Sequence, residues 1–455
     1  MRCVDRFCVS DNVNQSQVLK QTLQAFVLDA EGDLATALEQ YSADQLKLWS
    51  ATNLQGVNRS NLAIDMFLTE GQVAGQSVLD IFIENQPSLS QSDQALAEGW
   101  KKTFNGLFKV LQATPGRYEV MNWLTEKRYW VEPNEAQSAE ELARLGPGEI
   151  VVTRLSPDVG DAWTFSGPLM LLGKLGKPKL AVAIGNFKNW FPNHLYGDAP
   201  ELLEEAWKSV ERYHHDFVDF FGSDRITLSG YELNKKLKEY QEISTQRRLE
   251  ALGIDSSKSL KELVAESGVS EEEVAESMAS FGKDGHEVER LLKDDKAIKM
   301  ATPPINLPDE LRRAEAVTVF VHPRWGQTFL KDYVRLTQLF EATDDASVTK
   351  ADQLIQKYLK EDAVNAYVWR CFAEDNATPL MESLGRQFNR LDLTVDDLDD
   401  VLVQAGKPLE PKLPEIASVP MHLQDLFQEA MKEVDQGSSK KKSKGKQKQK
   451  TGFAV

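Results

Sequence analysis

Four short runs decide the fold: Phe108-Lys-Val-Leu-Gln-Ala-Thr114, Gly148-Glu-Ile-Val-Val-Thr-Arg-Leu155, Asp161-Ala-Trp-Thr-Phe-Ser-Gly-Pro168 and Leu180-Ala-Val-Ala-Ile-Gly-Asn-Phe187. Within them apolar and polar residues alternate, and β-branched and aromatic side chains are common. Pro-Gly, Gly-Pro-Gly and Gly-Asp sequences mark turns between them. Short strands joined by short turns predict a small antiparallel β-module, either a small barrel or a curled sheet.

The rest of the chain has mostly helical periodicity. Apolar residues recur at three- and four-residue spacing from Gln15 to the start of the β-module, and again from Pro200 to Phe221. Further helices are expected over 233–252, 329–342, 349–359, 364–373, 379–391, 395–405 and 421–434. We therefore expect an α+β chain, predominantly α-helical and multidomain, with a central small antiparallel β-module.

Composition shifts indicate where the chain divides. The proline-rich stretch Met300–Pro308 is the strongest boundary signal, and the Lys-rich end is of low complexity. We expect a disordered N-terminus (1–14), a helical domain (15–107), the β-module (108–191), a helical region (192–300), a C-terminal helical domain (301–435) and a disordered Lys-rich tail (436–455).

The charge of the chain is strongly acidic and unevenly distributed. The net charge is −17, and the stretch Ser438–Lys450 holds seven lysines and no acid, which leaves −24 for the rest. Because the chain outside this stretch is so acidic, it repels phosphate backbones and anionic lipids. We therefore expect the folded part to bind protein partners instead. The Lys-rich tail alone could make transient contact with an anionic membrane or RNA.

Cysteine content and hydropathy indicate the compartment. Cys3, Cys8 and Cys371 form no Cys-x-x-Cys pair and are too few for a disulfide framework, which favours a reducing environment. No apolar run approaches the roughly 18 residues that cross a bilayer, so no transmembrane segment is expected. We predict a cytoplasmic protein, with a position peripheral to a membrane as the alternative.

Sequence motifs give no sign of catalysis. The dinucleotide-binding, phosphate-binding, zinc-protease and serine-hydrolase signatures are all missing from the sequence. His214-His215-Asp216 falls in a helical stretch where adjacent side chains point about 100° apart, so one metal ion could not easily use both histidines. We expect no enzyme activity, catalytic residue, metal or cofactor, and a hydrolase with an unrecognised site remains an alternative.

The stretch from Ser259 to Phe281 has the sequence pattern of a helix-turn-helix. Its second helix would carry Glu271, Glu272, Glu273 and Glu276 where phosphates would lie. Since a recognition helix needs positive or neutral polar side chains, we expect a small packing module and no specific DNA binding. A nucleic-acid-associated regulator that uses this segment and the Lys-rich tail is the rival hypothesis.

Two aromatic segments are the candidate partner-binding residues. The first, Asn186 to His194, includes Trp190, Phe191 and His194, which would form a hot spot if exposed and would seal sheet to helix if buried. The second follows an apolar run and holds His322, Arg324 and Trp325. There the alternative is that the tryptophan anchors a turn and the arginine pairs with the acidic body.

Part of the chain resembles a known family. The residues Ala95-Leu-Ala-Glu-Gly-Trp-Lys-Lys-Thr-Phe104, Asn122-Trp-Leu-Thr-Glu-Lys-Arg-Tyr-Trp-Val131, Leu145-Gly-Pro-Gly-Glu-Ile-Val-Val-Thr-Arg-Leu155 and Trp163-Thr-Phe-Ser-Gly-Pro168 look like the helix-plus-β block of bacterial SEC-C-motif proteins. The Cys-rich zinc motif of that family is missing, so zinc is not implied. The many helical faces, the two aromatic segments and the acidic body with its basic tail lead us to expect a non-catalytic scaffold or assembly factor that binds protein partners. The whole chain is similar to proteins of cyanobacteria and plastid-bearing lineages, which implies that this role is an accessory one in photosystem biogenesis.

Overall fold

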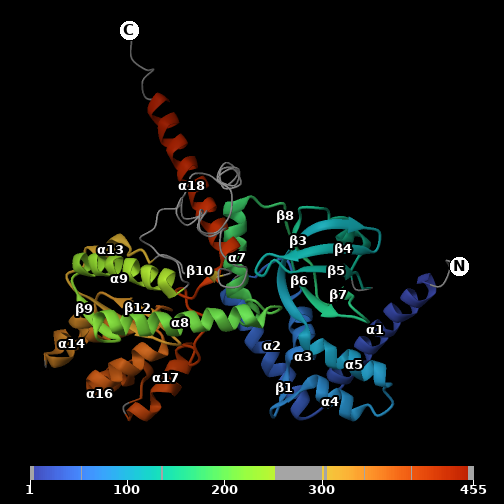
Figure 1. Cartoon of the computed structure of the whole chain (residues 1–455). Coiled ribbons are helices and arrows are strands. Elements are labelled where there is room, and N and C mark those ends of the chain that lie inside the picture. The colour runs from blue at the N-terminus through green and yellow to red at the C-terminus, as the bar shows by residue number, and fades with distance from the viewer. Residues whose placement is uncertain are drawn as a thin grey trace, which may run out of the picture. The chain divides into compact units, whose positions relative to one another are not determined.

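A computed structural model shows the architecture of the chain (Figure 1). It describes residues 5–448 apart from 53, 135–136, 252–299, 302–304, 343 and 391. The helix-turn-helix-like segment at 259–281 therefore lies outside the described residues. The chain forms two compact units: unit 1 is Met1–Leu203 with His422–Val455, and unit 2 is Glu204–Met421. The expected boundaries at 107/108 and 300/301 fall inside these units.

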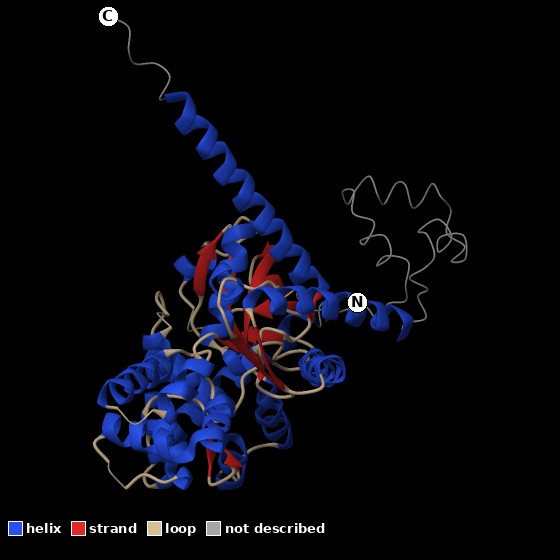
Figure 2. Cartoon of the chain, turned by 90° about the vertical axis from the view of Figure 1, so that its left-hand side faces the viewer, coloured by secondary structure: helices blue, strands red, loops and turns tan. Residues whose placement is uncertain are grey.

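Helix dominates both units, and strand is confined to a few patches (Figure 2). The structure has 56% helix and 16% strand, with one closed five-stranded barrel. This confirms the predicted α+β class and its helical majority. In the described part of the chain, no helix is both long enough and apolar enough to cross a membrane.

Unit 1 begins with five helices: α1 (Asp5–Leu28), α2 (Asp33–Ala51), α3 (Arg59–Glu70), α4 (Val78–Asn85) and α5 (Gln91–Gly99). A two-stranded hairpin, β1 (Gln72–Val73) and β2 (Gln76–Ser77), separates α3 from α4. Ser90 and Asp93 form a reciprocal capping box at the start of α5. The helices share a core around Leu23, Phe67 and Phe82.

The barrel consists of β3 (Phe104–Thr114), β4 (Arg117–Asn122), β5 (Arg128–Glu132), β6 (Ile150–Pro157) and β7 (Trp163–Phe165). The strand order is β3-β4-β5-β7-β6, and β6 pairs back to β3 to close the ring. Only the β5–β7 pair is parallel. This order, with helix α6 (Ala139–Ala143) between the third and fourth strands, is the topology of an OB-fold barrel.

The barrel interior is filled by side chains. Phe108, Val120, Val131, Leu155 and Phe165 are fully buried and form its core. One glycine makes this packing possible, since a Cβ atom on Gly106 would lie 2.4 Å from the ring of Phe108. A short strand, β8 (Met170–Gly173), extends the sheet along β6.

One of the four defining runs is not a strand. Residues 180–187 lie in helix α7 (Lys177–Trp190), so the prediction of strand there was wrong. The buried positions Leu180, Ala183, Ile184 and Phe187 have the spacing of one helical face. Pro178 in the first turn favours helix initiation, and a short apolar run cannot by itself distinguish strand from helix. The 3-10 turn η2 (Pro192–His194) follows.

Unit 2 combines a small sheet with helices. Helix α8 (Pro200–Phe221) leads into it, followed by β9 (Arg225–Leu228), α9 (Gly230–Ala251), β10 (Met300–Ala301) and α13 (Asp309–Arg312). Strands β11 (Val317–His322) and β12 (Gly326–Leu330) form an antiparallel sheet with β9 in the order β12-β11-β9. The remaining elements are α14 (Tyr333–Glu341), α15 (Asp345–Lys360), α16 (Ala366–Phe388), η3 (Val395–Asp397), α17 (Leu398–Gln404) and β13 (Val419–Pro420).

Two of the expected helices, 364–373 and 379–391, merge into the kinked helix α16. Asn376 has non-helical backbone angles (φ −144°, ψ 51°), and Pro379 follows it. The proline cannot donate the intrahelical hydrogen bond, which accounts for the break. Helix α18 (Met421–Lys448) returns the chain to unit 1. The predicted disorder of 1–14 and 436–455 stays a prediction.

Candidate functional site

Trp190 and Phe191 lie in the interior of unit 1. The indole nitrogen of Trp190 donates to the carbonyl of Thr52 at 3.1 Å, and the indole of Trp49 donates to the carbonyl of Trp190 at 3.0 Å. Phe191 packs against the rings of Trp49 and Phe187, with centroids 6.2 and 5.3 Å away. These contacts agree with the alternative in which the buried segment packs sheet against helix. Partner binding by Trp190 and Phe191 stays a prediction, and their burial disfavours it.

His194 is also buried, and both of its ring nitrogens are engaged. Nε2 lies 2.9 Å from a carboxylate oxygen of Glu70, and the backbone N–H of Asn105 donates to Nδ1 at 3.4 Å. An imidazole that donates from one nitrogen and accepts on the other has neither one left to serve as a general base. We therefore assign His194 a structural role.

Glu70 connects His194 to a buried charge network around Arg154. The Arg154 side chain has no solvent exposure and donates to Glu70 at 2.6 Å and to Thr69 at 2.7 Å. Its Nε lies 2.9 Å from Asp65, within ion-pair distance but outside hydrogen-bond geometry. Lys20 lies 2.7 Å from the same aspartate. The network ties α1 and α3 to barrel strand β6.

The electrostatics of this network favour its charged state. Burial alone would raise the pKa of Glu70, but the charge of Arg154 and the hydrogen bonds from Arg154 and His194 lower it to about 2. Burial opposes the charge of Arg154 as well, yet Glu70 and Asp65 hold the pKa of its guanidinium above the ordinary value. Because these charges are paired within the protein interior, loss of one partner would leave another charge buried without compensation, and the network offers no free reactive group.

The second predicted segment lies at the surface of unit 2. Arg324 is exposed, and its guanidinium carbon lies 4.1 Å from the ring centroid of Trp207 on α8. The backbone N–H groups of Arg324 and Trp325 both donate to Nδ1 of His322, at 3.0 and 3.2 Å. The imidazole therefore fixes the loop that presents the arginine. Trp325 is half-buried and packs against the core of unit 2.

His322 is held in turn by α16. Its ring lies 4.4 Å from that of Tyr367, whose hydroxyl donates to Asp224 at 3.4 Å. Burial lowers the pKa of His322, and the nearby His214 lowers it further. A neutral imidazole is the form that can accept both backbone N–H groups, so this shift is consistent with the observed loop. We call Trp207, His322, Arg324 and Tyr367 the Arg324 surface.

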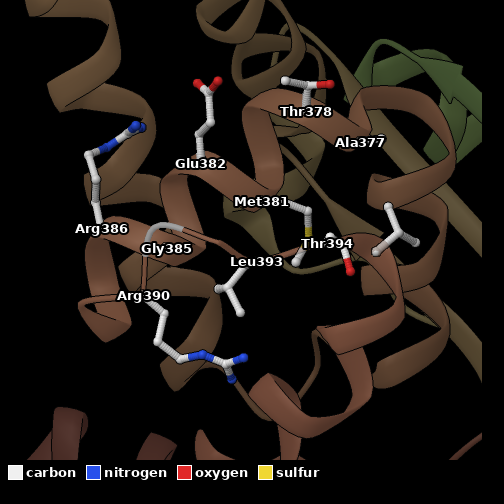
Figure 3. A pocket seen from close by; sticks show the side chains of 10 residues that line it. Ala377, Thr378, Met381, Glu382, Gly385, Arg386, Arg390, Leu393 and Thr394 are labelled. Carbon is white, nitrogen blue, oxygen red and sulfur yellow. The ribbon is translucent and has the colours of Figure 1, made fainter.

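A cavity of about 380 Å³ lies beside the second half of α16. Figure 3 shows Arg386 and Arg390 on one side, Thr378 and Thr394 on the other, and Met381 between them. Its remaining lining residues are Ala377, Glu382, Gly385, Leu393 and Val395.

Both arginines of this cavity are already paired. Arg386 donates twice to Asp352 at 2.8 Å, and Arg390 donates to Asp397 at 3.2 Å. With these carboxylates beside it, the cavity has no evident excess of positive charge to select an anion. Across the residues that the structure describes, no three His, Cys, Asp or Glu side chains are grouped to hold a metal ion.

Comparison with known proteins identifies no relative: no family model, no curated protein and no solved structure matches the chain. The resemblance to SEC-C-motif proteins therefore stays a prediction.

Two residues of these sites, Trp207 and Arg154, were not predicted from the sequence. Trp207 lies in the stretch 200–221, whose apolar spacing predicts only a helix, although a tryptophan at the edge of an apolar face is often half-exposed. Arg154 sits within the apolar strand Ile150–Leu155, where a single charge between buried positions requires buried partners. That signal was available in the sequence, but its partners Asp65 and Glu70 lie more than 80 residues away.

Proposed function

We propose that the chain is a non-catalytic scaffold that binds a protein partner through the Arg324 surface. The observation that carries the proposal is the stack of Arg324 on Trp207 at the surface of unit 2. Arginine and tryptophan are the residues most enriched in the energetic centres of protein interfaces. Among the residues described, Arg324 is exposed and no acidic group lies within ion-pair distance of it, so its hydrogen-bond donors stay available to a partner.

The loop is organised before binding, which favours a binding role. His322 accepts from two consecutive backbone N–H groups, and the cation–π contact restrains the arginine side chain. Restraining a long side chain in advance reduces the conformational entropy lost on association. Glu211 follows Trp207 by one turn of α8, so the rim around the stack carries both signs of charge, as interface rims commonly do.

The resemblance to cyanobacterial and plastid-lineage proteins gives a more specific version of this proposal. In that version the partner is a component of a photosystem under assembly. The Lys-rich tail would then hold the scaffold near an anionic membrane or near RNA by charge attraction.

Quantitative affinity purification tests the proposal. The tagged full-length chain and its Arg324→Ala and Trp207→Ala variants are expressed in the organism that carries the chain, and recovered proteins are compared by mass spectrometry. We expect both variants to recover at least fivefold less of the partner, since truncating a hot-spot side chain costs about 1–2 kcal/mol or more. Arg313→Ala removes an exposed arginine elsewhere in unit 2 and serves as the control.

Two outcomes would contradict the proposal in different ways. Recovery of no protein above the tag-only background would reject the scaffold function. Equal recovery by wild type and by both variants would keep a scaffold but reject the Arg324 surface. Circular dichroism of each variant checks that the fold is retained.

A further inference from the structure

The outer face of the barrel carries a stripe of aromatic and basic side chains. On the β4–β5 ladder, Arg117 lies next to the Glu119–Trp130 pair, and Met121 lies opposite Arg128. Lys109 on β3 lies opposite Met121 and continues the row toward Trp123. We call Lys109, Arg117, Trp123, Arg128 and Trp130 the Trp130 stripe.

Each tryptophan of the stripe has a cation over its ring. The guanidinium carbon of Arg117 lies 4.9 Å from the Trp130 centroid, and the ammonium of Lys109 lies 5.9 Å from the Trp123 centroid. Trp130 is 38% exposed, whereas Trp123 is half-buried with its indole nitrogen buried. The stripe therefore offers one exposed and one half-buried aromatic ring, each with a cation beside it.

The stripe has a local excess of positive charge. Its three cations face two acids, and the ion pairs are long: Arg128 lies 3.8 Å from Glu119, and Arg117 lies 4.0 Å from Glu132. The arginine side chains remain 67% and 49% exposed. At these distances the exposed pairs hold the arginines weakly, so their donors can turn to a ligand.

The spacing along the stripe suits a chain of stacked groups. Trp130 lies opposite Glu119 on the β4–β5 ladder, and Trp123 comes four residues after Glu119, in the turn that directly follows β4. Bases of a single strand can stack on such platforms whatever their sequence, while basic side chains follow the phosphates. Strand topology by itself would not specify a ligand, because barrels of this kind serve many functions.

We propose that the Trp130 stripe binds single-stranded nucleic acid without sequence preference. Bases stack on Trp130 and Trp123, and Arg117, Arg128 and Lys109 contact the phosphates. The acidic charge of the whole chain works against this association, so binding is weak and sensitive to salt. The stripe belongs to unit 1 and the Arg324 surface to unit 2, so either proposal can fail while the other holds.

Fluorescence anisotropy with a labelled oligo(dT) 20-mer tests the inference. The Lys-rich tail would bind the oligonucleotide independently of the Trp130 stripe. All variants are therefore made in a full-length chain in which the seven tail lysines are replaced by glutamine. We expect Trp130→Ala to raise Kd about tenfold, within the range measured for loss of one base–aromatic stack, and Trp130→Phe to stay near wild type. Arg313→Gln, outside the stripe, should leave Kd unchanged.

The salt dependence gives a second readout that an unfolded variant would not reproduce. Three phosphate contacts predict a slope of log K against log salt of about −2 for single strands, and Arg128→Gln should reduce its size by about 0.7. Circular dichroism confirms the fold of each variant. The inference is overturned if the glutamine-tail chain fails to bind, if Trp130→Ala binds as wild type does, or if duplex DNA binds equally well.

Discussion

At the scale of single residues, Arg154 and Glu70 show how a charge is kept inside this protein. An arginine with no solvent exposure is tolerated because Glu70, Asp65 and Thr69 all lie within 2.9 Å of its guanidinium nitrogens. Removing one member would leave another charge buried without compensation, which is far costlier than losing a surface ion pair.

The lowered pKa of Glu70 predicts acid sensitivity. Its pKa is about 2 in the folded chain against an ordinary value of 4.5, so its contribution to stability is complete above about pH 5 and is lost as the pH falls toward 2. The contribution amounts to at most about 3 kcal/mol. In urea unfolding between pH 5 and pH 2.5, wild type should lose more stability than Glu70→Gln does.

The control for this comparison is Glu84→Gln, which removes an exposed carboxylate from the same helical part of unit 1. It should follow the wild-type curve. If the free energy of unfolding fell equally with pH in wild type and in Glu70→Gln, the network would not lower the pKa of Glu70 in the folded chain.

Trp190 illustrates a question that the sequence left open. The same aromatic segment could be a surface hot spot or a seal, and only contacts with Trp49 and Thr52, more than 130 residues away, distinguish the two. Because Trp190 is buried and hydrogen-bonded, Trp190→Ala should lower the free energy of unfolding by about 3–5 kcal/mol.

Chemical denaturation measures this effect, and Trp130→Ala provides a matched change at an exposed tryptophan that should cost far less. If Trp190→Ala were as stable as wild type and only lost partner binding, the residue would belong to a surface after all.

At the scale of elements, α7 is a segment whose apolar periodicity does not distinguish a strand from a helix. The run 180–187 has apolar residues both at alternating positions and at helical spacing, so periodicity alone could not decide between strand and helix. The other three defining runs did become barrel strands: 108–114 lies in β3, 148–155 contributes to β6 and 161–168 contains β7. The parallel pairing of β5 with β7 could not be predicted, because a local pattern does not specify which distant strand closes the ring.

A glycine in α7 tests the helical assignment. Gly185 is exposed within the helix, and an added Cβ atom would meet no heavy atom within 4 Å. Gly185→Ala should therefore stabilise unit 1 by about 0.5–1 kcal/mol in thermal or urea unfolding. Gly160→Ala is the contrasting control, because Gly160 has a φ of 73° and alanine there should destabilise the chain. Destabilisation by Gly185→Ala would contradict a helix at this position.

At the scale of the whole molecule, composition and periodicity sufficed for the fold class but not for the sites. The helical majority follows from apolar spacing that continues over most of the chain. The Arg324 surface joins α8, the β11–β12 turn and α16, which lie far apart in the sequence, and no local pattern brings Trp207 to Arg324. His322 and Arg324 were predicted because a turn after an apolar run commonly presents binding groups.

In the proposed scaffold, the Arg324 surface is the site that holds the protein partner. The most direct measurement is the Kd of the partner recovered by affinity purification for the purified full-length chain and for Arg324→Ala, determined by isothermal titration calorimetry. We expect a Kd at least tenfold higher for Arg324→Ala, corresponding to about 1.4 kcal/mol, and an unchanged Kd for Arg313→Ala. Equal Kd values for wild type and Arg324→Ala would contradict it.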